Sequence, residues 1–285
     1  MQTLNIIGAG RVGQTLGRLW HSSGVFAVQD VLTNSLASAQ AACGFIGAGT
    51  PVAEVAHMRM ADVWMLAVPD GQIAPVAEHV AVAATSPASR TPIAFHCGGA
   101  QSSALLAALA ARGWQTASAH CILSFASAEA AMAQFPGTAC ALEGDAPAVA
   151  GLHSAFNTIQ ARCFEVQSQD KLLYHAAAVF ATNFLPVLQS VAEDAWLAAG
   201  VPPDLLPGLR SSLLSNAVAN ITRLGPAGAL TGPAARGDVA AIARQAAAVT
   251  QWDAQAGAAY DALSALALRL AKARTETKPT PASRT

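Results

Sequence analysis

Near its N-terminus the chain reads TLNIIGAGRVG over residues 3–13. The run 3–7 is short and aliphatic, as expected of a buried strand. Three glycines then follow the pattern G-x-G-x-x-G, and residues 11–22 have the apolar spacing of an amphipathic helix. A glycine-rich turn that joins a strand to a helix is typical of a dinucleotide-binding βαβ unit.

Each glycine of this turn has a separate role in such a unit. Gly8 permits the tight turn, Gly10 lets the backbone approach a pyrophosphate, and Gly13 lets the helix pack closely on the strand. The N–H groups at the start of the helix and its positive dipole end then favour phosphate binding. The sequence therefore predicts a dinucleotide site formed by Gly8, Gly10, Arg11, Val12 and Gly13.

Strand-like and helix-like segments alternate up to residue 167. After the strand at 3–7 and the helix at 11–22, the sequence predicts strands at 27–32, 62–68, 92–96, 116–120, 138–142 and 162–166. It predicts helices at 73–82, 102–112 and 146–156, and a helix-like segment from residue 52. Because strands separated by such helices indicate a parallel sheet, we expect an α/β fold over residues 1–167: a Rossmann doubly wound, mostly parallel sheet.

The pattern after residue 167 is all-helical. A long helix is expected at 169–199, with a kink at Pro186, because proline cannot continue the hydrogen bonding of a helix. In the loop at 225–238, Asp238 is a natural N-cap and Arg236 is suited to bind a carboxylate or form an ion pair. Further helices are expected at 205–224, 239–249 and 252–273.

These helices predict an all-α domain at 168–274 for substrate binding and dimerisation, followed by a disordered tail at 275–285 that is rich in Thr, Pro and Ser. The long helix would span about 46 Å, which is more than a domain of this size needs. Its stretch Ala176-Ala177-Ala178 permits close backbone approach. We therefore expect this helix to form much of a homodimer interface.

Composition narrows the class of protein. The 285 residues are 53% hydrophobic and 12% charged, with a net charge of -1 and no basic stripe, so nucleic-acid binding is not expected. No uninterrupted apolar run reaches about 18 residues and no signal peptide is evident, so neither membrane binding nor secretion is expected. The five cysteines are scattered without a C-x-x-C pair, which predicts neither a disulfide framework nor a metal site and favours the cytoplasm.

The residues after the second predicted strand bear on the choice of cofactor. An NAD site usually has Asp or Glu there to hold the ribose hydroxyls. This chain has Thr33-Asn34-Ser35, and Asp30 comes too early. Without a carboxylate a 2′-phosphate is not repelled, and these side chains can donate hydrogen bonds to it. Arg11 can lie near the adenine end. The sequence therefore favours NADP(H) over NAD(H).

Polar side chains follow several predicted strands, at the sheet edge where ligands bind. Val68-Pro69-Asp70 would lie beside the nicotinamide ribose. His96 and His120 end two consecutive strands and Ser124 follows the second, so these side chains can line one crevice. Alternatively, each histidine caps its strand or satisfies a buried hydrogen bond.

The start of the long helix offers candidates for acid–base chemistry. Lys171 and His175 are four residues apart and share one helix face. Facing a nicotinamide, they can give or take a proton at a substrate oxygen or nitrogen, and their mutual repulsion would lower the pKa of both. Alternatively, Lys171 is a solvated first-turn residue and His175 a packing residue. The predicted catalytic residues are Lys171, His175, Asn183, His96, His120 and Ser124, with His96 and Ser124 orienting the substrate.

Three stretches resemble a bacterial family of Rossmann-like proteins, proposed NADP oxidoreductases with a C-terminal helical domain of unknown function. They are the turn from Gly8 to Gly13, KLLYHAAA at 171–178 with Asn183, and LTGP at 230–233 with RGD at 236–238. The resemblance extends to about Lys272. The chain departs from the family at Gly98-Gly99 and His120-Cys121, where the family tends to have Ser-Gly and His-Pro.

More distantly, the chain is similar to deazaflavin-dependent NADP oxidoreductase, pyrroline-5-carboxylate reductase, ketopantoate reductase and the β-hydroxyacid dehydrogenases. In that wider group a long helix after the Rossmann domain helps to build the active site and often the dimer. The resemblance therefore implies the same uses for the helix at 169–199.

The sequence thus predicts a cytoplasmic NADP(H)-dependent oxidoreductase. Hydride would pass between the nicotinamide and a small carbonyl, hydroxyl or imine substrate in the interdomain cleft. A second interpretation is a non-catalytic NADP(H)-binding sensor that uses the helical domain to bind partners. A third, weaker one is another Rossmann enzyme such as a methyltransferase.

Overall fold

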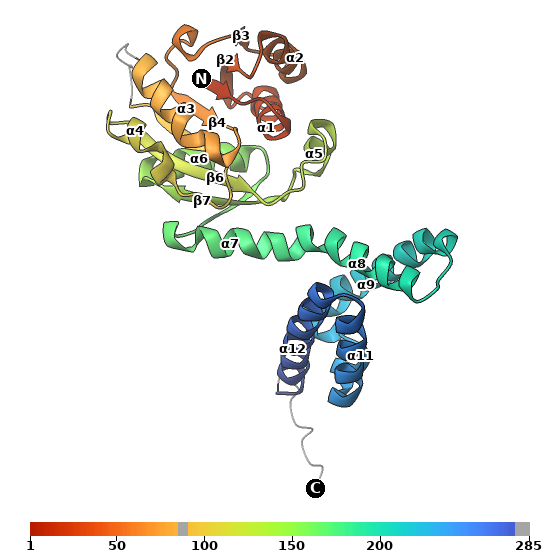
Figure 1. The fold of residues 1–285 in the computed structure, drawn as a ribbon. Helices are drawn as coiled ribbons and strands as arrows, with labels where there is room; N and C mark the ends of the chain where they lie inside the picture. Colours follow the sequence, from red (N-terminus) through yellow and green to blue (C-terminus); the bar gives the residue numbers. More distant parts are fainter. Residues whose placement is uncertain (85–90, 277–285) are drawn as a thin grey trace. The chain divides into compact units, whose positions relative to one another are not determined.

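The computed structural model describes residues 1–84 and 91–276 of the chain. Contacts between residues divide the chain into two compact units, Met1–Thr182 and Asn183–Thr285. The first unit contains a sheet with helices and the second is helical, as the element labels in Figure 1 show. Each unit is described in turn.

The first unit is built on an eight-stranded sheet in the order β3-β2-β1-β4-β5-β6-β7-β8. Every neighbouring pair is parallel except β6 and β7, which run antiparallel. This confirms the predicted Rossmann doubly wound, mostly parallel sheet. The strands are β1 (Gln2–Ile7), β2 (Phe26–Leu32), β3 (Thr50–Val52), β4 (Val63–Leu66), β5 (Ile93–His96), β6 (Gln115–Cys121), β7 (Ala139–Gly144) and β8 (Arg162–Glu165).

The sheet has a separate apolar core on each face. On one face Trp20 of α1 packs edge-on against Phe26 and Phe156, with ring centroids 5.3 and 5.0 Å away. On the other, Trp64 packs against Trp114 at 5.6 Å. Such aromatic contacts bury large apolar areas and fix the helices that position the loops above the sheet. The helices are α1 (Arg11–Ser22), α2 (Leu36–Ile46), α3 (Asp70–Ala83), α4 (Ala107–Ala110), α5 (Ala128–Gln134) and α6 (Ala146–Thr158).

Local structure differs from the sequence prediction at three places in this unit. The segment from residue 52 is not a helix, because β3 ends there and only the 3-10 turn Val55–His57 follows. Helices α2 and α5 were not predicted. Both begin at a serine N-cap, Ser35 and Ser127, whose hydroxyl accepts a backbone N–H. Both are rich in alanine, so the contrast between their apolar and polar faces is weak.

A continuous helical segment, Ser168–Ala198, runs across the boundary between the units. It consists of the 3-10 turn Ser168–Asp170, α7 (Lys171–Ala178), the π-helical turn Val179–Asn183 and α8 (Phe184–Ala198). A kink was expected at Pro186. The structure has the π-helical turn just before this residue. Pro186 has no N–H to donate to the carbonyl of Thr182, so regular hydrogen bonding is interrupted there.

The boundary between the units falls after Thr182, later than the sequence indicated. The reason lies at the start of α7. The side chain of Lys171 is 1% exposed, and its Nζ donates a hydrogen bond to Ser118 of β6. The first turns of the long helix are therefore tied to the sheet.

The described part of the second unit contains four further helices. They are α9 (Leu206–Ala229), α10 (Gly232–Arg236), α11 (Val239–Trp252) and α12 (Ala254–Glu276), with the 3-10 turn Pro203–Leu205 before them. Gly225, at φ 69° and ψ 168°, breaks α9. Part of the predicted loop at 225–238 is helical, since α10 lies within it. The side chain of Asp238 caps α11 as predicted, accepting the N–H of Ala241. The predicted tail, from residue 277 on, lies outside the described residues.

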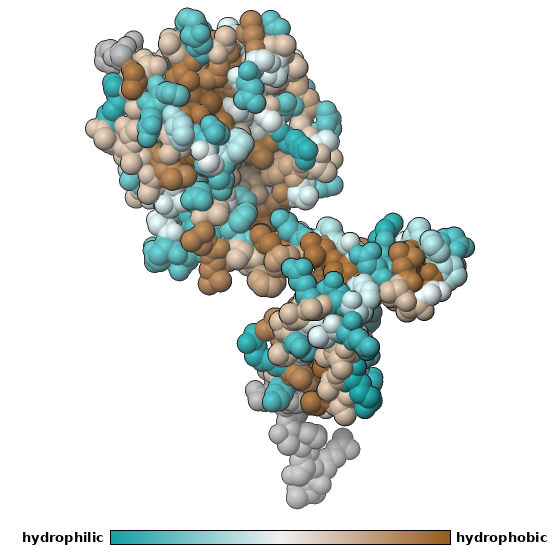
Figure 2. Space-filling model, in the orientation of Figure 1, coloured by the Kyte–Doolittle hydropathy of each residue, from teal (hydrophilic) through white to brown (hydrophobic). Residues whose placement is uncertain are grey.

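Few apolar side chains are buried in the second unit. Among its described residues only Leu206 and Ile242 are large apolar side chains with buried surfaces. Figure 2 shows apolar side chains on the surface of the C-terminal helices. The segment Ser168–Ala198 is, among the described residues, the one helix long and apolar enough to cross a membrane by length and composition alone. The sequence prediction missed it because polar residues interrupt its apolar runs.

Candidate active site

The glycine-rich turn has the conformation that a dinucleotide requires. Gly8 has φ +86°, and its N–H donates to the carbonyl of Leu32 at 2.8 Å. A Cβ at Gly8 would lie 2.7 Å from the carbonyl carbon of Ala67, and a Cβ at Gly13 would overlap the carbonyl of Gly8. These two glycines are therefore required for packing. Gly10, the N-cap of α1, differs, because a Cβ there would meet nothing within 4 Å.

The open space at Gly10 adjoins the start of α1. The first N–H groups of a helix have no acceptor inside the helix, and its dipole end is positive. The free N–H groups at the start of α1 and the open space at Gly10 together fit the pyrophosphate of a dinucleotide. The predicted role of Gly10, close backbone approach to a ligand, is thus compatible with the local geometry.

The residues after β2 form a cluster of hydroxyl groups at the start of α2. Thr33 Oγ1 and Ser35 Oγ each lie 2.7 Å from Ser38 Oγ. Asn34, between the first two, is exposed. Ser38 was not predicted, although the Ser-x-x-Ser spacing at a helix start was a usable signal. The cluster presents hydroxyl donors and a helix N-terminus without a carboxylate, which suits a 2′-phosphate.

Asp30 is not available to a cofactor ribose. Its side chain is 1% exposed and pairs with Arg59, whose Nη2 lies 2.6 Å from Asp30 Oδ1. The backbone N–H of Arg59 also donates to its other carboxylate oxygen at 2.7 Å. Asp30 therefore anchors the segment before β4, in agreement with its position being too early for a ribose contact.

A pocket of about 280 Å³ lies at the carboxyl ends of β4, β5 and β6. All its lining residues belong to the first unit. The sequence predicted five of them, namely Val12, Val68, Asp70, His120 and His175. The others, which sequence reasoning missed as site residues, are Ala67, Cys97, Gly98, Gly99, Ala119, Cys121, Leu123 and Phe125.

Two histidines meet in this pocket, one from β6 and one from α7. The rings of His120 and His175 have centroids 5.6 Å apart. His120 Nδ1 lies 2.8 Å from the hydroxyl of Tyr174, a residue that the sequence analysis did not single out. Tyr174 precedes His175 on α7, so the same helix supplies one pocket histidine and the partner of the other.

The environment keeps His120 neutral. Burial, then the nearby His175 and Lys171, lower the pKa of His120 to about 4. Burial also favours the neutral form of Tyr174. It raises the pKa of Tyr174, so the hydroxyl keeps its proton. With a neutral ring, one nitrogen of His120 is a donor and the other an acceptor.

Lys171 does not line the pocket. Its Nζ donates to Ser118 Oγ at 2.7 Å, and Ser118 donates to Glu143 at 2.9 Å. Ser103 and Ser168 donate to the same carboxylate at 2.8 and 2.6 Å. Burial lowers the pKa of Lys171, although Glu143 opposes this. Burial alone would raise the pKa of Glu143, but hydrogen bonds from the three serine hydroxyls and from the backbone N–H of Ser103 more than offset it, so that pKa is lowered.

Several predicted site residues have other roles. His96 is fully buried, with Nε2 3.0 Å from the carbonyl of Ser102 and Nδ1 accepting the N–H of Gly98. It therefore shapes the loop after β5 and is not a pocket residue, as the alternative interpretation stated. Burial lowers its pKa. Ser124 is exposed and is not among the lining residues of the pocket.

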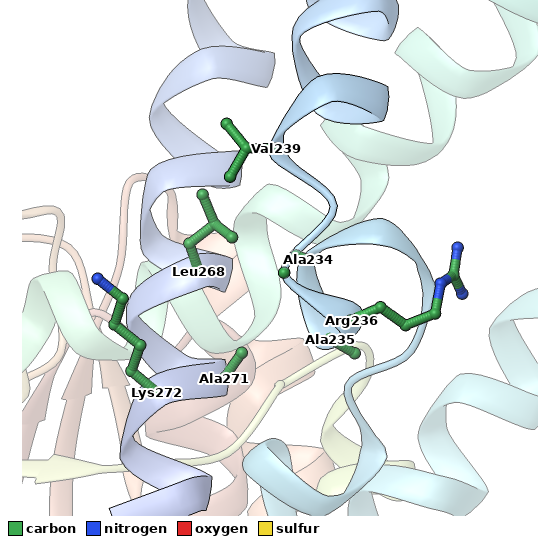
Figure 3. Close-up of a pocket in the computed structure, with 8 residues that line it drawn as sticks. Ala234, Ala235, Arg236, Val239, Leu268, Ala271 and Lys272 are labelled. Carbon is green, nitrogen blue, oxygen red and sulfur yellow. The ribbon is translucent and has the colours of Figure 1, made fainter.

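The remaining predicted residues are placed as follows. Arg11 donates to the carbonyl of Phe125, a pocket residue, so it is held near the pocket. Pro69 is the N-cap of α3. Asn183 ends the π-helical turn, at the start of the second unit. Arg236 forms no ion pair within the described residues; Figure 3 shows it beside a different pocket, pointing away from α12.

Comparisons with known proteins agree with this architecture. Residues 2–121 match the model of a Rossmann-like domain, and residues 138–267 match that of a domain of unknown function, DUF2520. The chain thus belongs to the family of Rossmann-like proteins that carry this C-terminal domain, which confirms the resemblance seen in its sequence. No curated protein matches the sequence.

Solved structures share the fold over nearly the whole chain. Protein TM1727 from Thermotoga maritima is 23% identical with a TM-score of 0.76, over 96% of this chain and 100% of that one. BF3122 from Bacteroides fragilis, a proposed NADP oxidoreductase, is 19% identical with a TM-score of 0.70, over 94% and 98%. A pyrroline-5-carboxylate reductase from Coxiella burnetii is 14% identical with a TM-score of 0.57, over 94% and 98%.

Proposed function

We propose that this protein is an NADP(H)-dependent oxidoreductase that transfers a hydride between the nicotinamide and a small carbonyl, hydroxyl or imine substrate. One observation carries the proposal. The dinucleotide turn at Gly10 and a pocket with two facing imidazoles lie in the same unit, and Val12 of the turn lines that pocket. The names of the solved relatives, a proposed NADP oxidoreductase and a reductase, support the same class.

The residues of the chain would divide the work as follows. The turn at 8–13 holds the pyrophosphate, and the hydroxyl cluster of Thr33, Ser35 and Ser38 holds the 2′-phosphate. When bound, the cofactor supplies or accepts the hydride. His175 exchanges a proton with the substrate heteroatom: its neutral ring takes the proton in oxidation, and its protonated ring returns it in reduction. His120, kept neutral, orients the same atom.

Lys171 would support the site without contacting the substrate. Because its Nζ is bonded to Ser118 inside the protein, it is not placed to reach a substrate in the pocket. Its hydrogen bonds hold the start of α7 against the sheet, and α7 carries Tyr174 and His175. The predicted acid–base pair of Lys171 and His175 is thereby replaced, in this proposal, by His175 and His120.

The test is a binding titration followed by turnover. NADPH is expected to bind more tightly than NADH and S-adenosylmethionine, and NADPH is expected to be consumed with a member of a panel of aldehydes, ketones and cyclic imines. Binding of NADPH without turnover of any panel member would favour the sensor. Tighter binding of S-adenosylmethionine would favour a methyltransferase and contradict the proposal.

Replacing Asn34 by aspartate is expected to reverse or flatten the preference for NADPH. The new carboxylate would lie within the hydroxyl cluster and repel a 2′-phosphate while accepting hydrogen bonds from a ribose diol. Fluorescence titrations of both cofactors measure the ratio. Asn157→Asp, on α6, makes the same charge change away from the cluster and serves as control. An unchanged ratio in Asn34→Asp would show that the 2′-phosphate binds elsewhere.

We also propose a cytoplasmic homodimer. The second unit buries only two large apolar side chains among those described, too few to stabilise a helical unit of this length in water. Large apolar side chains are exposed along α7 and α8 instead, among them Leu172, Leu173, Val187 and Leu188. Burial of such a face against a second copy would supply the missing core.

In solution the protein is therefore expected to have the mass of a dimer. Val187 and Val191 are 57% and 37% exposed and lie one turn apart on α8. Changing both to glutamate is expected to weaken the dimer, because charge would be placed in an apolar interface. Sedimentation velocity over a range of concentrations measures this, with Gln189→Glu on another side of the helix as control. A monomeric mass at every concentration of the wild type would refute the dimer.

A further inference from the structure

The two pocket histidines point ring nitrogens at one place, above Gly99. A Cβ at Gly99 would lie 2.8 Å from His120 Nε2 and closer still to His175 Nδ1. The two nitrogens are therefore at most about 5 Å apart, so one oxygen atom between them can lie within hydrogen-bonding distance of both. Gly99 itself is buried and lines the pocket.

Neither nitrogen has a hydrogen bond that explains its position. The other nitrogen of His120, Nδ1, is paired with Tyr174, which leaves Nε2 facing the pocket. His175 Nδ1 is the one buried side-chain nitrogen or oxygen without a hydrogen-bond partner in the described part of the chain. A buried polar atom without a partner destabilises the fold, so it calls for a ligand or a catalytic role.

We infer that His120 Nε2 and His175 Nδ1 together hold one oxygen atom, so that the reacting group of the substrate is a carbonyl or its alcohol and not an N-substituted imine. The inference rests on the proposed function and narrows its substrate class. A carbonyl oxygen has two lone pairs and accepts from two donors. A hydroxyl accepts from one ring and donates to the other. The nitrogen of a substituted imine has one lone pair, or one N–H once protonated, and satisfies only one of the two rings.

The chemistry balances at this atom. In reduction the carbonyl carbon gains the hydride, and the oxygen gains the proton of the His175 imidazolium, leaving an alcohol and a neutral ring. Throughout, His120 Nε2–H donates a hydrogen bond to the oxygen. Tyr174 is a positioning residue: by donating its hydroxyl proton to His120 Nδ1, it fixes the tautomer that carries the proton on Nε2. Because Gly99 has no side chain, both rings can pack against its backbone.

The experiment follows the two nitrogens directly. Protein labelled with ¹⁵N in its histidines is saturated with NADP⁺, so that an added ketone cannot be reduced. Cyclopentanone and methylpyrroline, five-membered rings that differ at the reacting group and that NADP⁺ does not oxidise in the proposed reaction, are then titrated. Cyclopentanone is expected to shift the resonances of both His120 Nε2 and His175 Nδ1, and methylpyrroline those of one at most. Any other pattern, whether one ring shifted by the ketone or both by methylpyrroline, overturns the inference.

Variants distinguish a loss of the oxygen site from a loss of folding or of NADP⁺ binding. Gly99→Ala is expected to weaken cyclopentanone binding by at least about tenfold, because its methyl group would overlap both ring nitrogens and push the two rings out of position, with NADP⁺ affinity unchanged. Gly71→Ala, at a glycine whose Cβ would meet nothing within 4 Å, is the control. Tyr174→Phe is expected to alter the His120 tautomer and its ¹⁵N shifts without unfolding the protein. Failure of the wild type to bind NADP⁺ would overturn the proposed function and this inference together, whereas normal NADP⁺ binding without the paired shifts overturns the inference alone.

Discussion

Replacing Gly10 by valine is expected to abolish NADPH binding and to leave the first unit folded. The side chain would project into the space beside the start of α1, where a pyrophosphate must approach the backbone. The fold should tolerate it, because a Cβ at this position meets nothing within 4 Å and the backbone is extended, at φ -74° and ψ -159°. Fluorescence titration measures the binding, and urea unfolding measures the stability.

Two other glycines make this prediction specific. Gly44→Val, on the exposed side of α2, also adds a side chain in open space and is expected to bind NADPH normally. Gly13→Ala is expected to lower the free energy of unfolding, because its methyl group would overlap the carbonyl of Gly8. Undiminished NADPH affinity in a folded Gly10→Val protein would refute the assignment of the turn to a dinucleotide.

The glycine turn and the sheet could be predicted from the sequence because both depend on short-range pattern. Gly8, Gly10 and Gly13 are five residues apart at most, and the central strands β1, β4 and β5 are short, mostly apolar runs. The unpredicted elements of the first unit were the three-residue strand β3 and the helices α2 and α5. The alanines of these two helices leave little periodicity. Their serine caps were the remaining local signal.

The candidate site was only partly predictable, because its contacts join residues far apart in the chain. Nothing near Lys171 in the sequence indicates that its ammonium reaches Ser118, or that Glu143 ends that network. His96 and His120 end neighbouring strands and look equivalent, yet both ring nitrogens of His96 bond to the loop after β5, whereas His120 faces the pocket. Local sequence identified the edge of the sheet, and tertiary packing decided which side chains face the ligand.

Removing either pocket histidine is expected to lower kcat by a factor of about 10²–10⁴, the usual range for a positioned acid or base. His175→Ala and His120→Ala should change NADPH affinity little, since neither residue belongs to the glycine turn. His120 is neutral above about pH 5, because its pKa is lowered to about 4, so its loss should leave the pH profile of kcat near neutral pH unchanged.

Lys171→Met is expected to act on stability instead. The substitution keeps the length of the side chain but removes the cation from a buried network, leaving Ser118 and Glu143 with an unmatched charge. Loss of a hydrogen bond from a charged group typically costs about 1.5–3 kcal/mol, which urea unfolding would detect. Activity of the folded protein is expected to fall less than in His175→Ala, because α7 loses its attachment to β6 but keeps His175. A stable Lys171→Met protein that loses kcat, beside a fully active His175→Ala protein, would return the proton transfer to Lys171.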